Sequence, residues 1–237
     1  MLPAPSHGST DMLTDPLLNH PAIVHGFGTR HDDMPALFPD LWPTRPLQRE
    51  RHGTRIAIAT GPNQDCGDAD GMLTDRPGLL LAIPTADCVP VLLARRDGGE
   101  VAALHAGWRG AHAGIVGGFA ALLRERGGDP GDWLAALGPA AQACCYEVSA
   151  DLIGDFFERT GLPPDAIARQ ARRLDLPAIV RWQLAQAGFK AVSAQPDCTM
   201  CVRDGEGRLA YHSYRRDRET RTPMVDVQWS AIAIVAH

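Results

Sequence analysis

The chain has 237 residues, of which 45% are hydrophobic and 22% are charged, and its formal net charge is −5. These values are ordinary for a globular protein, and a chain of this length can bury a sizeable core without disulfides or structural metals. Proteins that bind nucleic acids electrostatically usually show a basic balance or a basic stripe. The acidic balance argues against that class, so we expect no nucleic-acid partner.

The start of the chain and its apolar runs indicate the compartment. The first residues, MLPAPSHGSTDML, lack a basic stretch followed by an apolar run, so we expect no secretory signal. The longest apolar runs, LLLAIP and CVPVLLA, are far shorter than the roughly 20 residues that a membrane helix needs. We therefore expect a cytoplasmic protein with no membrane partner. In that compartment the six cysteines are reduced, metal-bound or catalytic rather than paired.

The first part of the chain predicts little regular structure apart from one strand. Residues 1–20 are polar and contain prolines, which indicates an irregular lead-in. Residues 22–28, AIVHGFG, predict a first strand, whereas residues 31–50 contain four prolines and predict a loop. Short apolar runs separated by Pro84 and a DGGE turn then predict three neighbouring strands at residues 79–83, 89–94 and 101–105.

The rest of the chain alternates helices and strands irregularly. Apolar residues at helical spacing predict helices over residues 111–126, over residues 147–160, and from an N-cap at Asp175 to Gly188. Further strands are expected at residues 133–137, 190–194, 209–214 and 231–235. The irregular order of elements favours a mixed sheet or sandwich with outer helices, rather than a regular doubly wound sheet, in a single α/β (α+β) domain over residues 1–237.

The densest chemical signal is the pair of motifs ADC at residues 86–88 and HAGWRG at residues 105–110. Cys88 begins one predicted strand and His105 ends the next, so an antiparallel pairing would bring them together at one end of the sheet. A thiolate beside an imidazole suits either a metal site, where sulfur and nitrogen ligands favour zinc, or a Cys–His nucleophile pair.

These motifs, with others in the same order, give the chain a family resemblance. The further motifs are HGFGTR at 25–30, DRPGLLLAIPTADC at 75–88, LGPAAQACCYEV at 137–148, DCT at 197–199 and HSYRRD at 212–217. Together they resemble the bacterial laccase-domain (YfiH-like) family, formerly called multicopper polyphenol oxidases. The resemblance implies a single-domain mixed β-sandwich flanked by helices, a fold like that of a deamidating bacterial toxin. It also implies a zinc-dependent purine nucleoside phosphorylase with adenosine deaminase activity, whose partners are a small-molecule nucleoside and phosphate.

The resemblance also implies which residues act. The family's metal ligands correspond to Cys88, His105 and His52, although the family's QVHG-like motif is here ERHG, with Glu50 in place of the glutamine. Three protein ligands leave one tetrahedral position open, which is the pattern of a catalytic zinc. The candidates for binding phosphate, whose oxygens match a guanidinium fork, are Arg30, Arg109 and Arg215.

Other functions stay open at the level of the sequence. Cys88 and His105 could form a cysteine hydrolase or deamidase, and the altered QVHG motif would suit a non-catalytic member of the family. Copper-dependent phenol oxidation is less favoured, because the nine histidines include no HxH pair. The preferred nucleoside and the oligomeric state are also left open.

The remaining cysteines could form a second zinc site. Cys198 and Cys201 have CxxC spacing, and Cys144 and Cys145 are adjacent. Because adjacent cysteines do not easily both reach one ion, we expect no second site.

Overall fold

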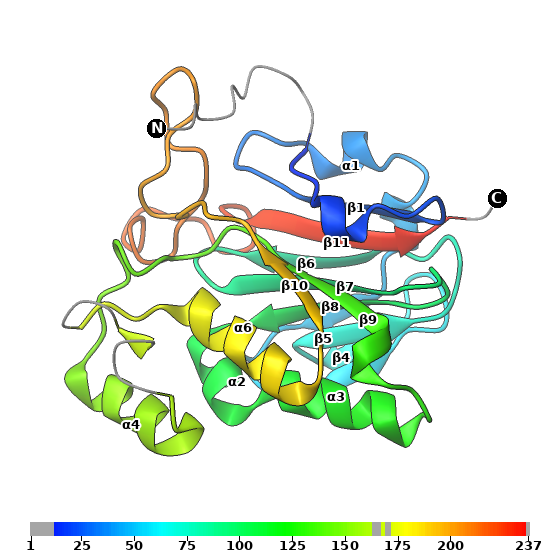
Figure 1. Ribbon diagram of the computed structural model, residues 1–237. Helices are drawn as coiled ribbons and strands as arrows, with labels where there is room; N and C mark the ends of the chain where they lie inside the picture. Colours follow the sequence, from blue (N-terminus) through cyan, green and yellow to red (C-terminus); the bar gives the residue numbers. More distant parts are fainter. Residues whose placement is uncertain (1–11, 163–166, 169–171, 236–237) are drawn as a thin grey trace.

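Two β-sheets stacked face to face form the centre of the protein in the computed structural model, which describes residues 12–162, 167–168 and 172–235 (Figure 1). The larger sheet has six strands in the order β10-β9-β7-β8-β5-β3, and the smaller has three in the order β1-β11-β6. Strands β2 and β4 form a separate short ribbon. This mixed β-sandwich confirms the expected fold class.

The strands of the larger sheet run in both directions. Its members are β3 (Ile56–Ile58), β5 (Gly71–Thr74), β7 (Val89–Arg95), β8 (Val101–Ala106), β9 (Trp133–Leu137) and β10 (Ala191–Ala194). The other strands are β1 (Ile23–Phe27), β2 (Leu47–Arg49), β4 (Asp65–Asp68), β6 (Leu81–Thr85) and β11 (Gln228–Ile234). Strand β7 pairs antiparallel with both β8 and β9, whereas β9–β10 and β3–β5 are parallel pairs.

Alternation of side chains along the strands separates three apolar layers. In β7, Val91 and Leu93 face the helices, whereas Leu92 packs between the two sheets. In β11 of the smaller sheet, Ile232 faces the larger sheet and Ala231 faces outward, toward the segment that contains α1. Because successive side chains of a strand point to opposite faces, strands buried on both sides become continuously apolar. This explains the runs LLLAIP and CVPVLLA.

Helices cover the outer faces of the two sheets (Figure 1). Their bounds are α1 (Met34–Leu37), α2 (Trp108–Ala113), α3 (Ile115–Glu125), α4 (Ala150–Thr160) and α6 (Leu176–Ala187). The expected Asp175 N-cap is present, since its carboxylate accepts a hydrogen bond from the Ala178 N–H, and α6 ends at Gly188. None of the helices in the described residues is long and apolar enough to cross a membrane.

Several predicted elements were wrong in detail. The helix expected over residues 111–126 is two helices, because Gly114 takes a left-handed conformation with φ of 94° between α2 and α3. The helix expected from residue 147 begins after Ser149, whose hydroxyl caps the Leu152 N–H. Residues 31–50 contain α1, a short 3-10 helix and β2 as well as loop.

Strand placement shows further differences from the sequence-based expectation. The strand expected at 79–83 belongs to the smaller sheet, so it does not neighbour β7 and β8 as predicted. Residues 209–214 form no regular strand; an isolated bridge pairs Leu209 with Arg203. The short strands β3, β4 and β5 were not predicted. The N-terminal part of the expected lead-in, residues 1–11, lies outside the described residues.

Replacing Phe119 with Ala tests the layer between the larger sheet and the helices. The Phe119 ring is fully buried and meets the Trp133 ring edge-on at 5.5 Å between centroids. We expect Phe119→Ala to lower the free energy of unfolding by about 3–5 kcal/mol, because it leaves a cavity in a close-packed core. Chemical denaturation measures this. The matched control is Phe157→Ala on α4. The Phe157 side chain is exposed, so its loss should change the free energy of unfolding little. Equal effects of the two changes would contradict the placement of Phe119 in the layer between the larger sheet and the helices.

Candidate active site

The register of the β7–β8 pair places Cys88 next to His105. Pro90 lies opposite His105, and Val89 lies opposite Ala106, in an antiparallel pairing. Cys88 directly precedes β7 and His105 lies near the end of β8. The two side chains that carry the ADC and HAGWRG motifs therefore meet at one end of the larger sheet.

His52 approaches the same point from the loop that joins β2 to β3. One ligand atom each of His52, Cys88 and His105 lies within 4.8 Å of the other two. The two imidazole rings are 4.8 Å apart at an angle of 74°, so they meet edge to face. The structure thus brings together the three residues that the sequence analysis named as metal ligands, including the histidine of the altered ERHG motif.

A buried carboxylate, Asp70, holds both histidines. It is 1% exposed and directly precedes β5. Its oxygens accept hydrogen bonds from three successive backbone N–H groups, those of Arg51 at 3.1 Å, His52 at 2.8 Å and Gly53 at 2.7 Å. The same carboxylate contacts Nδ1 of His105 at 2.9 Å. This contact leaves Nε2 as the ring nitrogen of His105 that is free to bind a ligand.

The two glycines of HAGWRG provide the space that these side chains occupy. A Cβ atom on Gly107 would lie 2.9 Å from Sγ of Cys88 and 3.0 Å from a ring carbon of His52. A Cβ atom on Gly110 would lie 2.8 Å from the carbonyl oxygen of Gly53. All three distances are shorter than ordinary van der Waals contacts, so side chains here would displace the loop that carries His52.

The site strongly perturbs the protonation of Cys88 and His105. Burial alone would raise the pKa of the Cys88 thiol, but His105 and His52 lower it to about 7. Burial alone would lower the pKa of His105, but Cys88, Glu50 and Asp70 raise it well above the usual value. The pair therefore favours thiolate and imidazolium, a state in which the sulfur is ready either to bind a cation or to act as a nucleophile.

Asp87 connects Cys88 to the C-terminal part of the chain. Its backbone is left-handed, with φ of 85°, which is costly for a residue other than glycine. Its carboxylate compensates by accepting hydrogen bonds from the hydroxyls of Thr199 at 2.7 Å and Ser213 at 3.0 Å and from the Arg215 N–H at 2.6 Å. The DCT and HSYRRD motifs thus meet at the residue beside Cys88.

The three candidate ligands lie in a cavity of about 740 Å³. Arg109 and Arg215 line this cavity, whereas Arg30 is not among its lining residues. The Arg215 guanidinium lies over the Tyr146 ring, 4.9 Å from its centroid. Aromatic side chains contribute much of the wall, namely Trp108, Tyr146, Tyr214 and Trp229. The cavity therefore combines flat apolar surfaces with fixed positive charge, as a site for a small anionic or ring-shaped ligand requires.

Sequence reasoning assigned no role in the site to two acidic residues, Asp70 and Glu50. Asp70 stands directly before a strand that was not predicted, so nothing marked it as more than a loop residue. Glu50 is two residues before His52, and one of its oxygens lies 3.6 Å from Nδ1 of His105. Its other oxygen is buried and has no hydrogen-bond partner among the described residues. The one available signal for Glu50 was its place in the ERHG motif.

Comparisons with known proteins identify the family of the chain. A family model described as "Multi-copper polyphenol oxidoreductase laccase" matches residues 43–231, so the chain belongs to this laccase-domain family. It is 32% identical to "Purine nucleoside phosphorylase YfiH" of Shigella flexneri over 75% of this chain and 71% of the relative. It is 37% identical to "Purine nucleoside phosphorylase SCO2081" of Streptomyces coelicolor over 71% and 68%. These relatives carry enzyme names, which supports an enzymatic role for the family.

Solved structures resemble the fold over nearly its whole length. Bacillus licheniformis hypothetical protein YfiH superimposes with a TM-score of 0.78 at 25% identity, covering 90% of this chain and 92% of that one. YlmD from Geobacillus stearothermophilus gives a TM-score of 0.78 at 27% identity and covers 94% of both chains. The family resemblance seen in the motifs therefore extends to the three-dimensional arrangement.

Replacing Asp70 with Asn tests the role of this carboxylate in holding the histidines. The change removes the negative charge beside His105 and one acceptor for the loop that carries His52. We expect the affinity of the site for a divalent metal ion to fall by roughly 10–100-fold, as is typical when the partner of a metal-binding histidine is lost. A competition titration with a chromophoric chelator measures this. Asp97→Asn, which affects an exposed pair with Arg95, should leave the affinity unchanged; an unchanged affinity in Asp70→Asn would refute the role.

Proposed function

We propose that this chain is a zinc-dependent purine nucleoside phosphorylase. The observation that carries the proposal is the convergence of one cysteine and two histidines in the lining of a cavity that also presents arginines and aromatic rings. The names of the relatives support the same activity. The proposed reaction joins phosphate to C1′ of the nucleoside, breaks the bond from C1′ to the purine nitrogen, and releases the purine and the sugar 1-phosphate.

The donor set fits zinc better than copper. One thiolate with two imidazoles matches the mixed sulfur and nitrogen ligands of catalytic zinc sites, which keep one position open. The carboxylate on Nδ1 of His105 is the usual support for a zinc-binding histidine. Of the two groups of potential ligands among the described residues, neither is a cluster of histidines such as several copper ions would need. When bound, zinc would supply a positive charge that polarises a group in the open position.

Different residues of the chain would bind the phosphate and the nucleoside. Guanidinium groups match phosphate oxygens, so we assign phosphate to Arg109 and Arg215, which line the cavity. Arg30 remains a further candidate from its motif. The aromatic side chains that line the cavity offer faces on which a purine ring can stack. The guanidinium of Arg215 lies over one of these rings, that of Tyr146. The loop that contains Tyr146 and the HSYRRD segment would therefore position the phosphate and the nucleoside.

Adenosine deamination is proposed as a second activity of the same site. In that reaction water replaces the exocyclic amino group of adenosine and ammonia leaves, which needs an activated water but no phosphate. The competing hypothesis is a cysteine hydrolase, and one observation favours it. The pKa of Cys88 falls to about 7 beside His105, as expected of an activated nucleophile.

Replacing Cys88 with Ala separates these possibilities. We expect the zinc at the Cys88 site to be lost, so that the protein holds one ion fewer per chain than the wild type. Phosphorolysis should fall by more than roughly 100-fold, since changes to residues that only support a ligand already cost up to that much. The fold should persist, because a chain of this size does not need a metal for stability. Elemental analysis beside a chromatographic assay of nucleoside plus phosphate measures both quantities.

The control for this change is Cys66→Ala, which removes a buried cysteine from β4, outside the cavity lining. It should keep metal and activity. Zinc at this site and full activity retained in Cys88→Ala would refute the proposal. Zinc retained at this site, with the same number of ions as the wild type but with lost activity, would instead support Cys88 as a nucleophile. Wild-type activity that survives chelation but not thiol alkylation would support the same hypothesis.

Replacing Arg215 with Lys tests the assignment of phosphate. Lysine keeps the charge but loses the planar fork, so we expect KM for phosphate to rise by about 10-fold, or about 1.4 kcal/mol, while KM for the nucleoside changes little. Steady-state kinetics with each substrate varied in turn measures this. Arg124→Lys on α3 is the control, because that side chain contacts the Ala187 carbonyl and does not line the cavity. A larger effect at Arg30→Lys than at Arg215→Lys would move the phosphate to the HGFGTR motif.

A further inference from the structure

Four cysteines form a second cluster, separate from His52, Cys88 and His105. Cys144 and Cys145 lie in the loop that follows β9, and Cys198 and Cys201 lie in the loop that follows β10. Because β9 and β10 are neighbouring parallel strands, these loops leave the sheet at the same end. One Sγ atom from each cysteine lies within 4.8 Å of the other three. This contradicts our expectation that adjacent cysteines would not converge.

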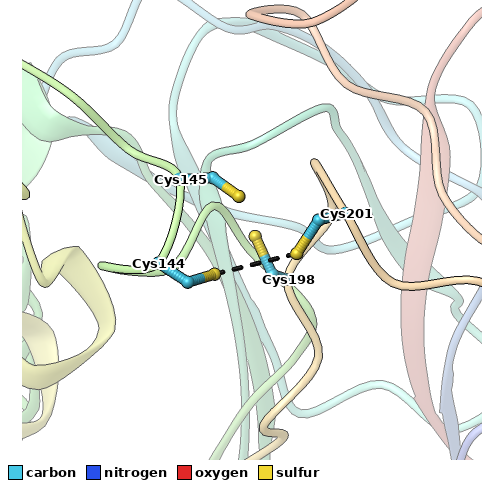
Figure 2. A group of neighbouring side chains, drawn as sticks. All are labelled: Cys144, Cys145, Cys198 and Cys201. Atoms are coloured by element: carbon cyan, nitrogen blue, oxygen red, sulfur yellow. Dashed lines mark hydrogen bonds between the residues drawn. The ribbon is translucent and has the colours of Figure 1, made fainter.

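A tight turn explains how Cys144 and Cys145 can both face the cluster. The N–H of Cys145 donates to the Gln142 carbonyl at 3.0 Å, and the N–H of Glu147 donates to the Cys145 carbonyl at 2.9 Å. The backbone curls around these bonds, so the two adjacent side chains lie on its inner side. Figure 2 shows all four sulfur atoms pointing toward a common centre.

The second loop forms a similar turn around the first cysteine of CTMC. The N–H groups of Cys201 and Val202 donate to the Cys198 carbonyl at 3.3 and 3.1 Å. The N–H of Gln142, from the other loop, points at Sγ of Cys198 at 3.5 Å. Backbone N–H groups directed at sulfur stabilise a thiolate, which is the form that binds metals. The buried Cys198 thus anchors the cluster, while Cys144 and Cys201 lie at its exposed side.

The spacing of the sulfur atoms distinguishes a metal site from disulfides. Four sulfurs placed about 2.3 Å from one tetrahedral ion lie about 3.8 Å from each other. The distance from Sγ of Cys144 to Sγ of Cys201 is 3.8 Å. A disulfide requires about 2.05 Å between sulfurs, and all four cysteines are free. Two separate disulfides would also not require all four sulfurs to share one centre.

We propose that Cys144, Cys145, Cys198 and Cys201 form a tetrathiolate zinc site that is structural rather than catalytic. All four coordination positions would be filled by the protein, which leaves no place for a substrate. This site is independent of the proposed phosphorylase activity, and it would hold zinc whether or not Cys88 does.

The position of the cluster gives this site a defined structural effect. Tyr146, which lines the cavity, directly follows Cys145, and Thr199, which holds Asp87, directly follows Cys198. An ion bound by both loops would cross-link the segment that carries Tyr146 to the segment that positions Asp87. Folding of these loops onto the cavity would then be coupled to metal binding.

The experiment counts zinc in protein purified under reducing conditions, using elemental analysis. We expect two ions per chain in the wild type, and one in either the Cys88→Ala protein or the Cys144→Ser/Cys201→Ser protein. Cobalt added to zinc-free Cys88→Ala protein should give the intense absorption of a tetrahedral tetrathiolate site. The triple variant Cys88→Ala/Cys144→Ser/Cys201→Ser should not give it. Cys66→Ser is the control for loss of a cysteine elsewhere and should keep both ions.

The Cys88→Ala protein keeps the proposal falsifiable if the double variant fails to fold, since its four-cysteine cluster is intact. Binding of no zinc by folded Cys88→Ala would overturn the proposal, as would two ions in Cys144→Ser/Cys201→Ser. A Cys144–Cys201 disulfide found by peptide mapping of wild-type protein that is active as purified would also overturn it. Failure of the phosphorylase proposal alone would look different, because the tetrathiolate cobalt spectrum would remain while nucleoside phosphorolysis was absent.

Discussion

The active-site geometry depends on one buried carboxylate. Asp70 accepts hydrogen bonds from three successive backbone N–H groups of the His52 loop and contacts Nδ1 of His105 through Oδ1. Burial alone would raise the pKa of Asp70, but the hydrogen bonds from His105 and from the Gly53 and Arg51 N–H groups lower it. The charged form is therefore the stable one, and it offsets the left-handed backbone of His52, with φ of 58°.

The sheet supplies the rigid part of the site, and loops complete it. The Asp70 carbonyl accepts a hydrogen bond from the His105 N–H at 2.7 Å, so the carboxylate is fixed to β8 by backbone as well as by side chain. Cys88 is fixed by the register of β7 against β8. Of the three candidate ligands, His52 alone lies in a loop, the one between β2 and β3, that no strand of the larger sheet pairs with. Its position therefore requires the empty space at Gly107 and Gly110, which accounts for two glycines of the HAGWRG motif.

Sequence reasoning predicted the parts that are governed by local pattern. The strands around Cys88 and His105 and the capped helix from Asp175 follow from apolar periodicity and from turn residues, and their antiparallel meeting point follows from topology. The sheet to which residues 79–83 belong was not predictable, because a strand buried on both faces has the same composition in either sheet. Asp70 was missed because its role arises only when β5 pairs with β8. The Cys144–Cys145 pair was misjudged because a turn, and not strand alternation, sets the direction of its side chains.

Glu50 stands where the family resemblance implies a glutamine. The free-energy cost of burying its carboxylate depends on what the site binds. Burial raises the pKa of Glu50, while the positive charge of His105 opposes that rise. Cys88, Asp70 and Glu50 together place three acidic groups around two imidazoles, which gives the site an excess of potential negative charge. A dication bound by Cys88 and the histidines would attract each carboxylate and favour its charged form. An acidic residue at position 50 is therefore most costly without a metal and least costly with one, so the departure from the family motif is compatible with a metal site and adds negative charge that favours cation binding.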